Sequence, residues 1–154
     1  MAKANPNKKN FRAFVTDVAI DLGRYEEGIG LLNESLRLRG PDDVNQNILA
    51  YCHWESGRED LAYQWYVESL RLNPNNRSSL RGACYLAIEG GHDVEALNYC
   101  ERFHETAPTG MEETLWFAIA LHNSGNSENL ARAERLISDS DPALSLREQF
   151  DRIE

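Results

Sequence analysis

Little in this chain of 154 residues points to a membrane or to export. No apolar run approaches the roughly 18 residues that a membrane-spanning helix requires. The first ten residues are polar, include Lys3, Lys8 and Lys9, and lack the apolar stretch of a signal peptide. We therefore expect residues 1–8 to form a flexible leader and the protein to be cytoplasmic.

Cysteine is scarce, with only Cys52, Cys84 and Cys100 in the chain. An odd number gives no fully paired disulfide framework, and unpaired cysteines commonly pack as small buried hydrophobes. We predict three unpaired thiols and a reducing compartment. Cys100 and His104 stand i, i+4, a spacing that can place two metal ligands on one helix face, but no further Cys or His completes a set. No metal site is predicted.

Positive charge is also in short supply, because 16 Lys and Arg residues face 25 Asp and Glu residues, for a net charge of −9. Nucleic-acid binding needs clustered cations, and so does binding to anionic lipid. The balance argues against both and leaves two interpretations open, plain solubility or a basic or mixed protein partner. Motifs for phosphate binding, nucleophilic catalysis or zinc hydrolysis are missing from the sequence, so we predict no catalytic residues and no cofactor.

What the sequence does contain is a repeat. Gly23, Gly57, Gly91 and Gly125 are each 34 residues apart, and a proline column keeps nearly the same step at Pro41, Pro74, Pro108 and Pro142. Five residues after each glycine the chain has Gly28, Ala62, Ala96 and Leu130. Self-similarity of this length indicates a short helix–turn–helix unit that must stack on its neighbours to bury its apolar face.

Each column has a mechanical role. The glycine ends the first helix of a unit in a left-handed turn without a Cβ clash. The small residue allows two helices to approach closely. The proline ends the second helix, because it lacks an N–H and its ring clashes with the preceding turn.

At these positions the chain resembles the tetratricopeptide repeat (TPR) family. The best copy is Asp43–Asn76, which carries the family pattern at Leu49, Ala50, Gly57, Ala62, Tyr66, Leu70, Leu72 and Pro74. The fourth copy departs from the pattern in its second helix, where Leu130 replaces the usual alanine and Glu134 replaces a large apolar residue. The resemblance implies an all-α, right-handed superhelix of four repeats, over 9–42, 43–76, 77–110 and 111–142.

The periodicity predicts helix pairs at about 10–22 with 25–38, 43–56 with 59–72, 77–90 with 93–106, and 110–124 with 127–139. Thr109 with Glu112 reads as a capping box at the start of the seventh helix. Asp141 and Pro142 open a last helix over 142–154. Its apolar stripe is expected to cap the final repeat, which would otherwise leave apolar surface exposed.

In TPR proteins the first helix of each pair lines a concave groove, and the resemblance places the partner site there. The groove columns of this chain combine acidic, aromatic and apolar side chains, and the predicted site residues are Asp17, Asp21, Asn47, Tyr51, Trp54, Glu55, Arg81, Tyr85, Glu89, Ile119 and His122. Tyr51, Trp54 and Tyr85 would form an aromatic wall, and such residues commonly anchor interfaces. A clamp for a free carboxylate is not expected, because the groove has no lysine and is rich in acidic residues.

We therefore predict a non-catalytic protein–protein interaction module that holds an extended peptide or an amphipathic helix with basic and apolar residues. Two narrower alternatives stay open. Small acidic TPR proteins serve as secretion chaperones for type III translocator subunits, and this chain resembles those chaperones in size and charge. An array that stacks on itself as a homo-oligomer is the other.

Overall fold

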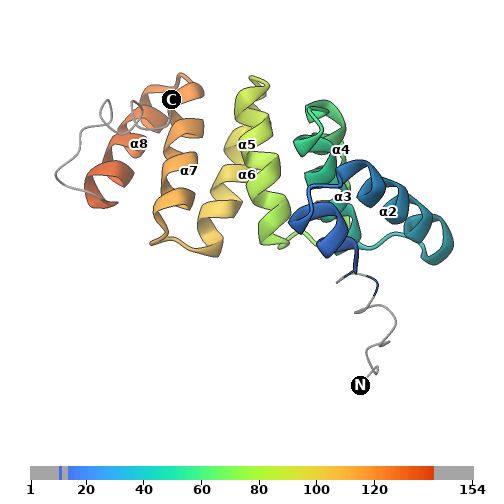
Figure 1. Ribbon diagram of the computed structural model, residues 1–154. Helices are drawn as coiled ribbons and strands as arrows, with labels where there is room; N and C mark the ends of the chain where they lie inside the picture. The colour runs from blue at the N-terminus through green and yellow to red at the C-terminus, as the bar shows by residue number, and fades with distance from the viewer. Residues whose placement is uncertain (1–10, 12–13, 141–154) are drawn as a thin grey trace. The chain divides into compact units, whose positions relative to one another are not determined.

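The computed structural model describes residue 11 and residues 14–140, so residues 1–10, 12–13 and 141–154 lie outside this account (Figure 1). The predicted leader at 1–8 and capping helix at 142–154 both lie outside the described residues. Throughout the described ranges the regular elements are helices and none is a strand. The elements in chain order are η1 (Asp17–Asp21), α2 (Tyr25–Arg39), α3 (Asp43–Glu55), α4 (Glu59–Leu72), α5 (Arg77–Glu89), α6 (Asp93–Thr106), α7 (Met111–Asn123) and α8 (Ser127–Ser140).

The prediction of an all-α chain is confirmed, and the helix ends agree with the expected ranges to within a residue or so from α2 onward. The first helix differs. Its described residues 14–16 are α-helical, but its last turn, η1, is wound as a π-helix. Three second helices end just before the proline column, as predicted. Their last residues are Arg39, Leu72 and Thr106, each two positions before a proline.

The four periodic glycines all lie in turns between helices, and their φ angles are 62°, 71°, 67° and 66°. Those values fall in the left-handed region that side chains with a Cβ rarely adopt. In the second copy the amide of Gly57 donates to the carbonyl of Trp54 at 2.8 Å, and the amide of Arg58 donates to the carbonyl of His53 at 2.9 Å. These bonds satisfy the last carbonyls of α3 and reverse the chain into α4.

The helix start predicted at Thr109 is wrong. The N-cap of α7 is Gly110, and no side chain caps it. Glu113, the third residue of the helix, is buried and folds back over Gly110, where an added Cβ would lie 2.1 Å from its Oε2. The acidic residue therefore takes the place near the helix start that a capping box gives to its Glu, one residue later than the sequence pattern indicates.

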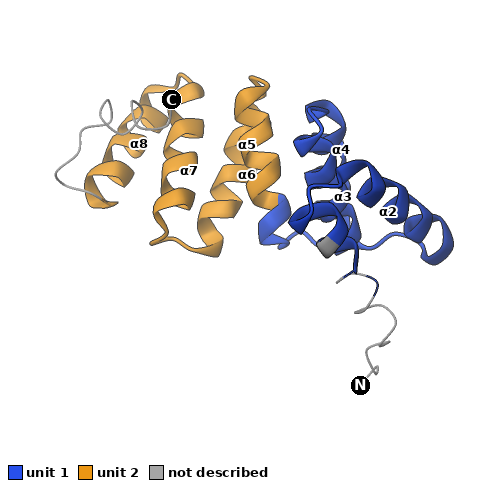
Figure 2. Cartoon of the chain, viewed as in Figure 1, with its two compact units in different colours: residues 1–79 blue, residues 80–154 orange. Residues whose placement is uncertain are grey.

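The chain divides into two compact units, Met1–Ser79 and Leu80–Glu154, with the division in the first turn of α5 (Figure 2). In the first unit a core cluster is contributed by the first helix with its η1 turn, by α2 and by α3, and it comprises Val15, Ala19, Ile29, Leu32, Ile48, Leu49 and Cys52. In the second unit the largest fully buried side chains are Phe103, Phe117, Leu80, Leu121 and Ile137.

The column of small residues marks close helix contacts. Ala62 and Ala96 are almost fully buried, at 0% and 1% exposure. In the first copy the contact is tighter still, since a Cβ added to Gly28 would lie 2.3 Å from the Cβ of Ala19. Glycine replaces alanine here because Ala19 already supplies the one methyl group for which the contact has room.

The last described helix shows how the fourth copy accommodates its departures. Leu130 is only half-buried and Glu134 is exposed, whereas Ala133 and Ile137 are buried. Ile137 is buried like Phe103 and Ser69, its equivalents in the earlier copies. The small buried residue of this helix is Ala133, in place of position 130, where the repeat predicts it. The helix is rotated so that Glu134 stays in water.

The cysteine prediction is wrong for two of the three residues. Cys84 of α5 and Cys100 of α6 form a disulfide with a Cα–Cα distance of 4.9 Å, and only Cys52 is free. The two columns that these cysteines occupy face each other across the turn at Gly91, which the sequence spacing alone does not reveal. The argument from unpaired thiols to a reducing compartment no longer holds, and a metal site at Cys100 and His104 loses a ligand.

None of the helices in the described ranges combines the length and the apolar character that crossing a bilayer requires.

The contact at Gly28 gives a matched pair of variants. Gly28→Ala should destabilise the protein by about 1–3 kcal/mol, because the new methyl group overpacks a rigid contact. Gly30→Ala, on the same helix, meets nothing within 4 Å and should stabilise by up to about 1 kcal/mol through helix propensity. Urea denaturation measures both. In an Ala19→Gly background the penalty of Gly28→Ala should largely disappear; equal penalties in the two backgrounds would contradict this contact.

The disulfide is tested by counting thiols. Denatured without reductant, the protein should show one reactive thiol, that of Cys52, rather than three. Reduction should lower the stability of the second unit by about 2–4 kcal/mol, as expected for a bond that closes a loop of this length. A Cys84→Ala/Cys100→Ala variant should unfold at the same temperature with and without reductant. Three reactive thiols in the untreated protein would show that the bond is not formed.

Candidate functional site

The exposed side of α3 brings together four of the predicted site residues. Asn47, Tyr51, Trp54 and Glu55 stand at i, i+4, i+7 and i+8, a spacing that lines up one helix face. The opposite side carries the buried Ile48, Leu49 and Cys52 of the core cluster. We call the four residues the α3 face. Three of them are half-buried and Glu55 is exposed, so the face is open to a partner.

Aromatic rings dominate this face. The rings of Tyr51 and Trp54 meet edge to face, with centroids 6.4 Å apart and planes at 88°. Tyr25, the first residue of α2, adds a third ring, 6.2 Å from that of Tyr51 and inclined at 74°. Edge-to-face contacts of this kind are favourable for aromatic pairs. They hold the three rings in one arrangement before any partner arrives.

Glu55 shapes the electrostatics of the face. The hydroxyls of Tyr25 and Tyr51 lie close enough to its carboxylate for that group to affect their titration. Burial, together with the hydrogen bond to Glu55 and its charge, raises the pKa of Tyr51 to about 12. Desolvation and Glu55 also raise the pKa of Tyr25. Both phenols therefore remain neutral at physiological pH and leave the charge of the carboxylate uncompensated.

Asn47 is committed to packing within its unit. Its Nδ2 donates to Oγ of the buried Ser79 at 3.1 Å, and that hydroxyl lies 2.7 Å from Oγ of Ser69. Ser69 in turn donates to the carbonyl of Asp43 at 2.8 Å. This buried network joins α3, α4 and the start of α5, so Asn47 serves chiefly to position the α3 face.

The first copy contributes less to the described site. Asp21 ends η1 and is exposed. Asp17 begins η1, but its side chain lies outside the described residues. Their predicted place in the partner groove stays a prediction.

In the second unit, Tyr85 is half-buried and its ring meets that of Trp116 edge to face at 5.2 Å and 90°. Arg81 forms an ion pair with Glu112. Glu89 and His122 are exposed. These predicted residues of α5 and α7 are thus available on the surface of their unit, with Arg81 already neutralised by a neighbour.

Ile119 does not fit its predicted role. It is only 8% exposed and lies within a continuous run of buried residues, Phe117–Leu121. Because α7 is buried on most of its sides, the column that exposes Tyr51 and Tyr85 in earlier copies points into packed protein here. Ile119 contributes to the core rather than to an open surface.

Sequence reasoning missed two aromatic residues, Tyr25 and Trp116. Tyr25 stands in the first turn of a second helix, outside the columns that the family resemblance assigns to the groove. Trp116 lies one position after the column that contains Asn47 and Arg81, about 100° further round the helix. A search for aromatic residues one position either side of each groove column would have found Trp116.

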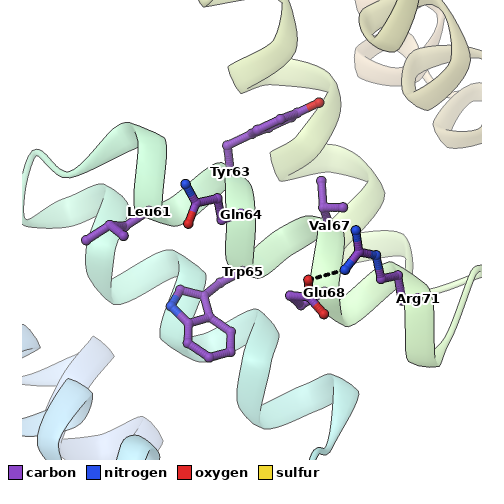
Figure 3. Close-up of a pocket in the computed structure, with 7 residues that line it drawn as sticks. All are labelled: Leu61, Tyr63, Gln64, Trp65, Val67, Glu68 and Arg71. Carbon is purple, nitrogen blue, oxygen red and sulfur yellow. Dashed lines mark hydrogen bonds and ion pairs between the residues drawn. The ribbon is translucent and has the colours of Figure 1, made fainter.

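The outer side of α4 holds a second feature, an open depression of about 460 Å³. Leu61 and Trp65 point to one side of the helix and Tyr63 and Val67 to the other, while Glu68 and Arg71 form an ion pair with each other (Figure 3). Trp65 also packs against the core cluster of the first unit. The depression is lined mainly by apolar atoms of residues on this single helix and has no unpaired charge of its own.

No model of a known protein family matches the chain, and no curated protein matches it in sequence. Solved structures do. MamA from Desulfovibrio magneticus is 18% identical with a TM-score of 0.76, over 91% of this chain and 78% of that one. YrrB, described as a TPR protein with an unusual peptide-binding site, is 15% identical with a TM-score of 0.71, over 89% of this chain and 70% of that one.

A tetratricopeptide repeat protein from Parabacteroides merdae is 20% identical with a TM-score of 0.68, over 91% of this chain and 55% of that one. At this level of identity the likeness defines the fold. The chain has the fold of a TPR protein, as the glycine period predicts, and the sequence resemblance is confirmed at that level.

The pKa of Tyr51 yields a pH prediction. A phenol whose folded-state pKa is raised from 10.0 to about 12 holds its proton in the folded protein after the unfolded chain has lost it. Folding stability should therefore fall as the pH rises from about 10 through about 12. Ultraviolet titration should show a tyrosine that ionises late, and Tyr51→Phe should remove it. Glu55→Gln should make it ionise earlier; an unchanged titration in both variants would contradict the contact.

Proposed function

We propose that this chain is a non-catalytic protein–protein interaction module that binds a peptide or helix of another protein on the α3 face. The arrangement of Tyr25, Tyr51 and Trp54 carries the proposal. Three half-buried rings, held by mutual contacts on one surface, offer a large and rigid apolar area at low entropic cost, as interface anchors do. The TPR fold supports the same function, since YrrB is described as having a peptide-binding site.

The charge of the molecule supports a basic partner. The net charge of −9 steers cationic segments toward the protein, and Glu55 adds an exposed carboxylate beside the rings. The apolar rings and the acidic residue together match the partner predicted from the sequence, one with both basic and apolar side chains. A secretion chaperone and a self-assembling array remain special cases of this function.

The depression on α4 is the competing surface. Its apolar lining by Leu61, Trp65 and Val67 would suit an apolar helix. It lacks the uncompensated charge of the α3 face, because Glu68 and Arg71 pair with each other. We favour the α3 face for this reason and use the depression as the control surface.

A displayed library of random peptides, selected on the immobilised protein, gives a defined ligand for the test. Tyr51→Ala or Trp54→Ala should weaken binding of the selected peptides by about 2 kcal/mol or more, as truncation of interface anchors does. Leu61→Ala, at an exposed residue of the depression, should leave affinity unchanged. Calorimetry measures affinity, and circular dichroism verifies folding.

The reverse pattern would reassign the site. If Leu61→Ala abolishes binding while Tyr51→Ala and Trp54→Ala bind normally, the partner occupies the outer side of α4. If no variant of either surface affects the selected peptides, the proposal for the α3 face fails.

A further inference from the structure

We propose that the corner formed by Tyr25, Tyr51, Trp54 and Glu55 is a receptor for one cationic side chain, a lysine or an arginine of the partner. The inference rests on the proposed function, because it names the chemistry that the α3 face recognises. It joins two observations, the ring geometry and the charge of Glu55.

The three rings lie next to one another. In each of the two edge-to-face pairs, at 74° and 88°, one ring presents its edge to the other, so the pairs are not stacked face on face. All three residues are half-buried, so each keeps part of its surface in contact with solvent. We call this group of three neighbouring rings and the carboxylate of Glu55 the corner, and the electron-rich faces of aromatic rings attract a cation.

The carboxylate at this corner lacks a cation of its own. Arg24 precedes Tyr25 but pairs with Glu27, and Arg58 follows Glu55 but pairs with Glu26. Among the described residues no lysine or arginine forms an ion pair with Glu55. The exposed carboxylate lies instead near two tyrosine hydroxyls, which do not neutralise its charge.

These features favour a cation over the alternatives. An anionic group would be repelled by Glu55. A purely apolar side chain would cover the carboxylate of Glu55 and remove its water without supplying a hydrogen-bond donor or a positive charge in return. A guanidinium or ammonium group can satisfy both parts of the corner, with its charge against the carboxylate and its plane or methylene stem against the rings.

The test uses two blocked tripeptides that differ in charge alone. Alanine–arginine–alanine is the probe, and alanine–citrulline–alanine is its neutral counterpart of nearly the same shape. Nitrogen–proton NMR reports the indole of Trp54, and the chain's two other tryptophans serve as internal controls. Trp54→Phe assigns the signal.

We expect the arginine peptide to shift the Trp54 indole in a saturable way and the citrulline peptide to leave it unmoved. Glu55→Gln should weaken arginine binding by about fivefold to tenfold, the range of a cation held by aromatic faces and an exposed charge. Glu59→Gln removes one exposed acidic residue from the start of α4 and should have no effect. Equal shifts with both peptides, or no shift with arginine, would overturn the inference.

Failure of this inference can be told from failure of the proposed function. Peptides selected on the protein are re-tested with each basic residue replaced by citrulline or norleucine. Binding that depends on Tyr51 but ignores these replacements and Glu55→Gln leaves the interaction module standing and removes the cation receptor. Binding that ignores Tyr51 as well removes both.

Discussion

The structure depends on a steric constraint that the first three copies share at a spacing of 34 residues, the close approach of paired helices at a position that holds only glycine or alanine. Gly28 lies against Ala19, and Ala62 and Ala96 are buried at the equivalent positions. The left-handed glycines return each second helix at the angle that allows this contact. With the helices so close, one side of each is packed against its partner and the other is left outside, which is why the α3 face can present aromatic rings without weakening the core.

The sequence predicts the steric part of this fold well because each requirement falls on a single residue type. A positive φ demands glycine at 57 or 91, and a proline at 74 ends α4 whatever surrounds it. Helix rotation is different, since it is settled by the summed packing of many side chains. Ile119 shares a column with Tyr51 but is buried, and Glu134 stays in water because α8 turns to bury Ala133 instead. The disulfide escaped prediction for the same reason, because the distance between Cys84 and Cys100 depends on how α5 and α6 face each other.

The candidate site shows the same division. The spacing of Tyr51, Trp54 and Glu55 on one helix places them together, and the structure does so. Tyr25 comes from the preceding helix, α2, through a tertiary contact that no local pattern encodes, yet it completes the corner beside Glu55. The residues that α3 contributes to the site can therefore be predicted from their spacing in the sequence. The contact with Tyr25 depends on how the helices pack and is seen only in the folded structure.

The bond between Cys84 and Cys100 has a mechanical consequence. It ties together two points separated by 16 residues along the chain. When the chain is pulled from its ends, the force passes through the disulfide and not through the residues between the two cysteines. The fully extended chain is therefore shorter by about 50 Å, at roughly 3.5 Å per residue. Under tension the hairpin of α5 and α6 would remain a closed loop after the hydrogen bonds of its helices had broken, and the first unit, which has no such bond among its described residues, would extend along its whole length.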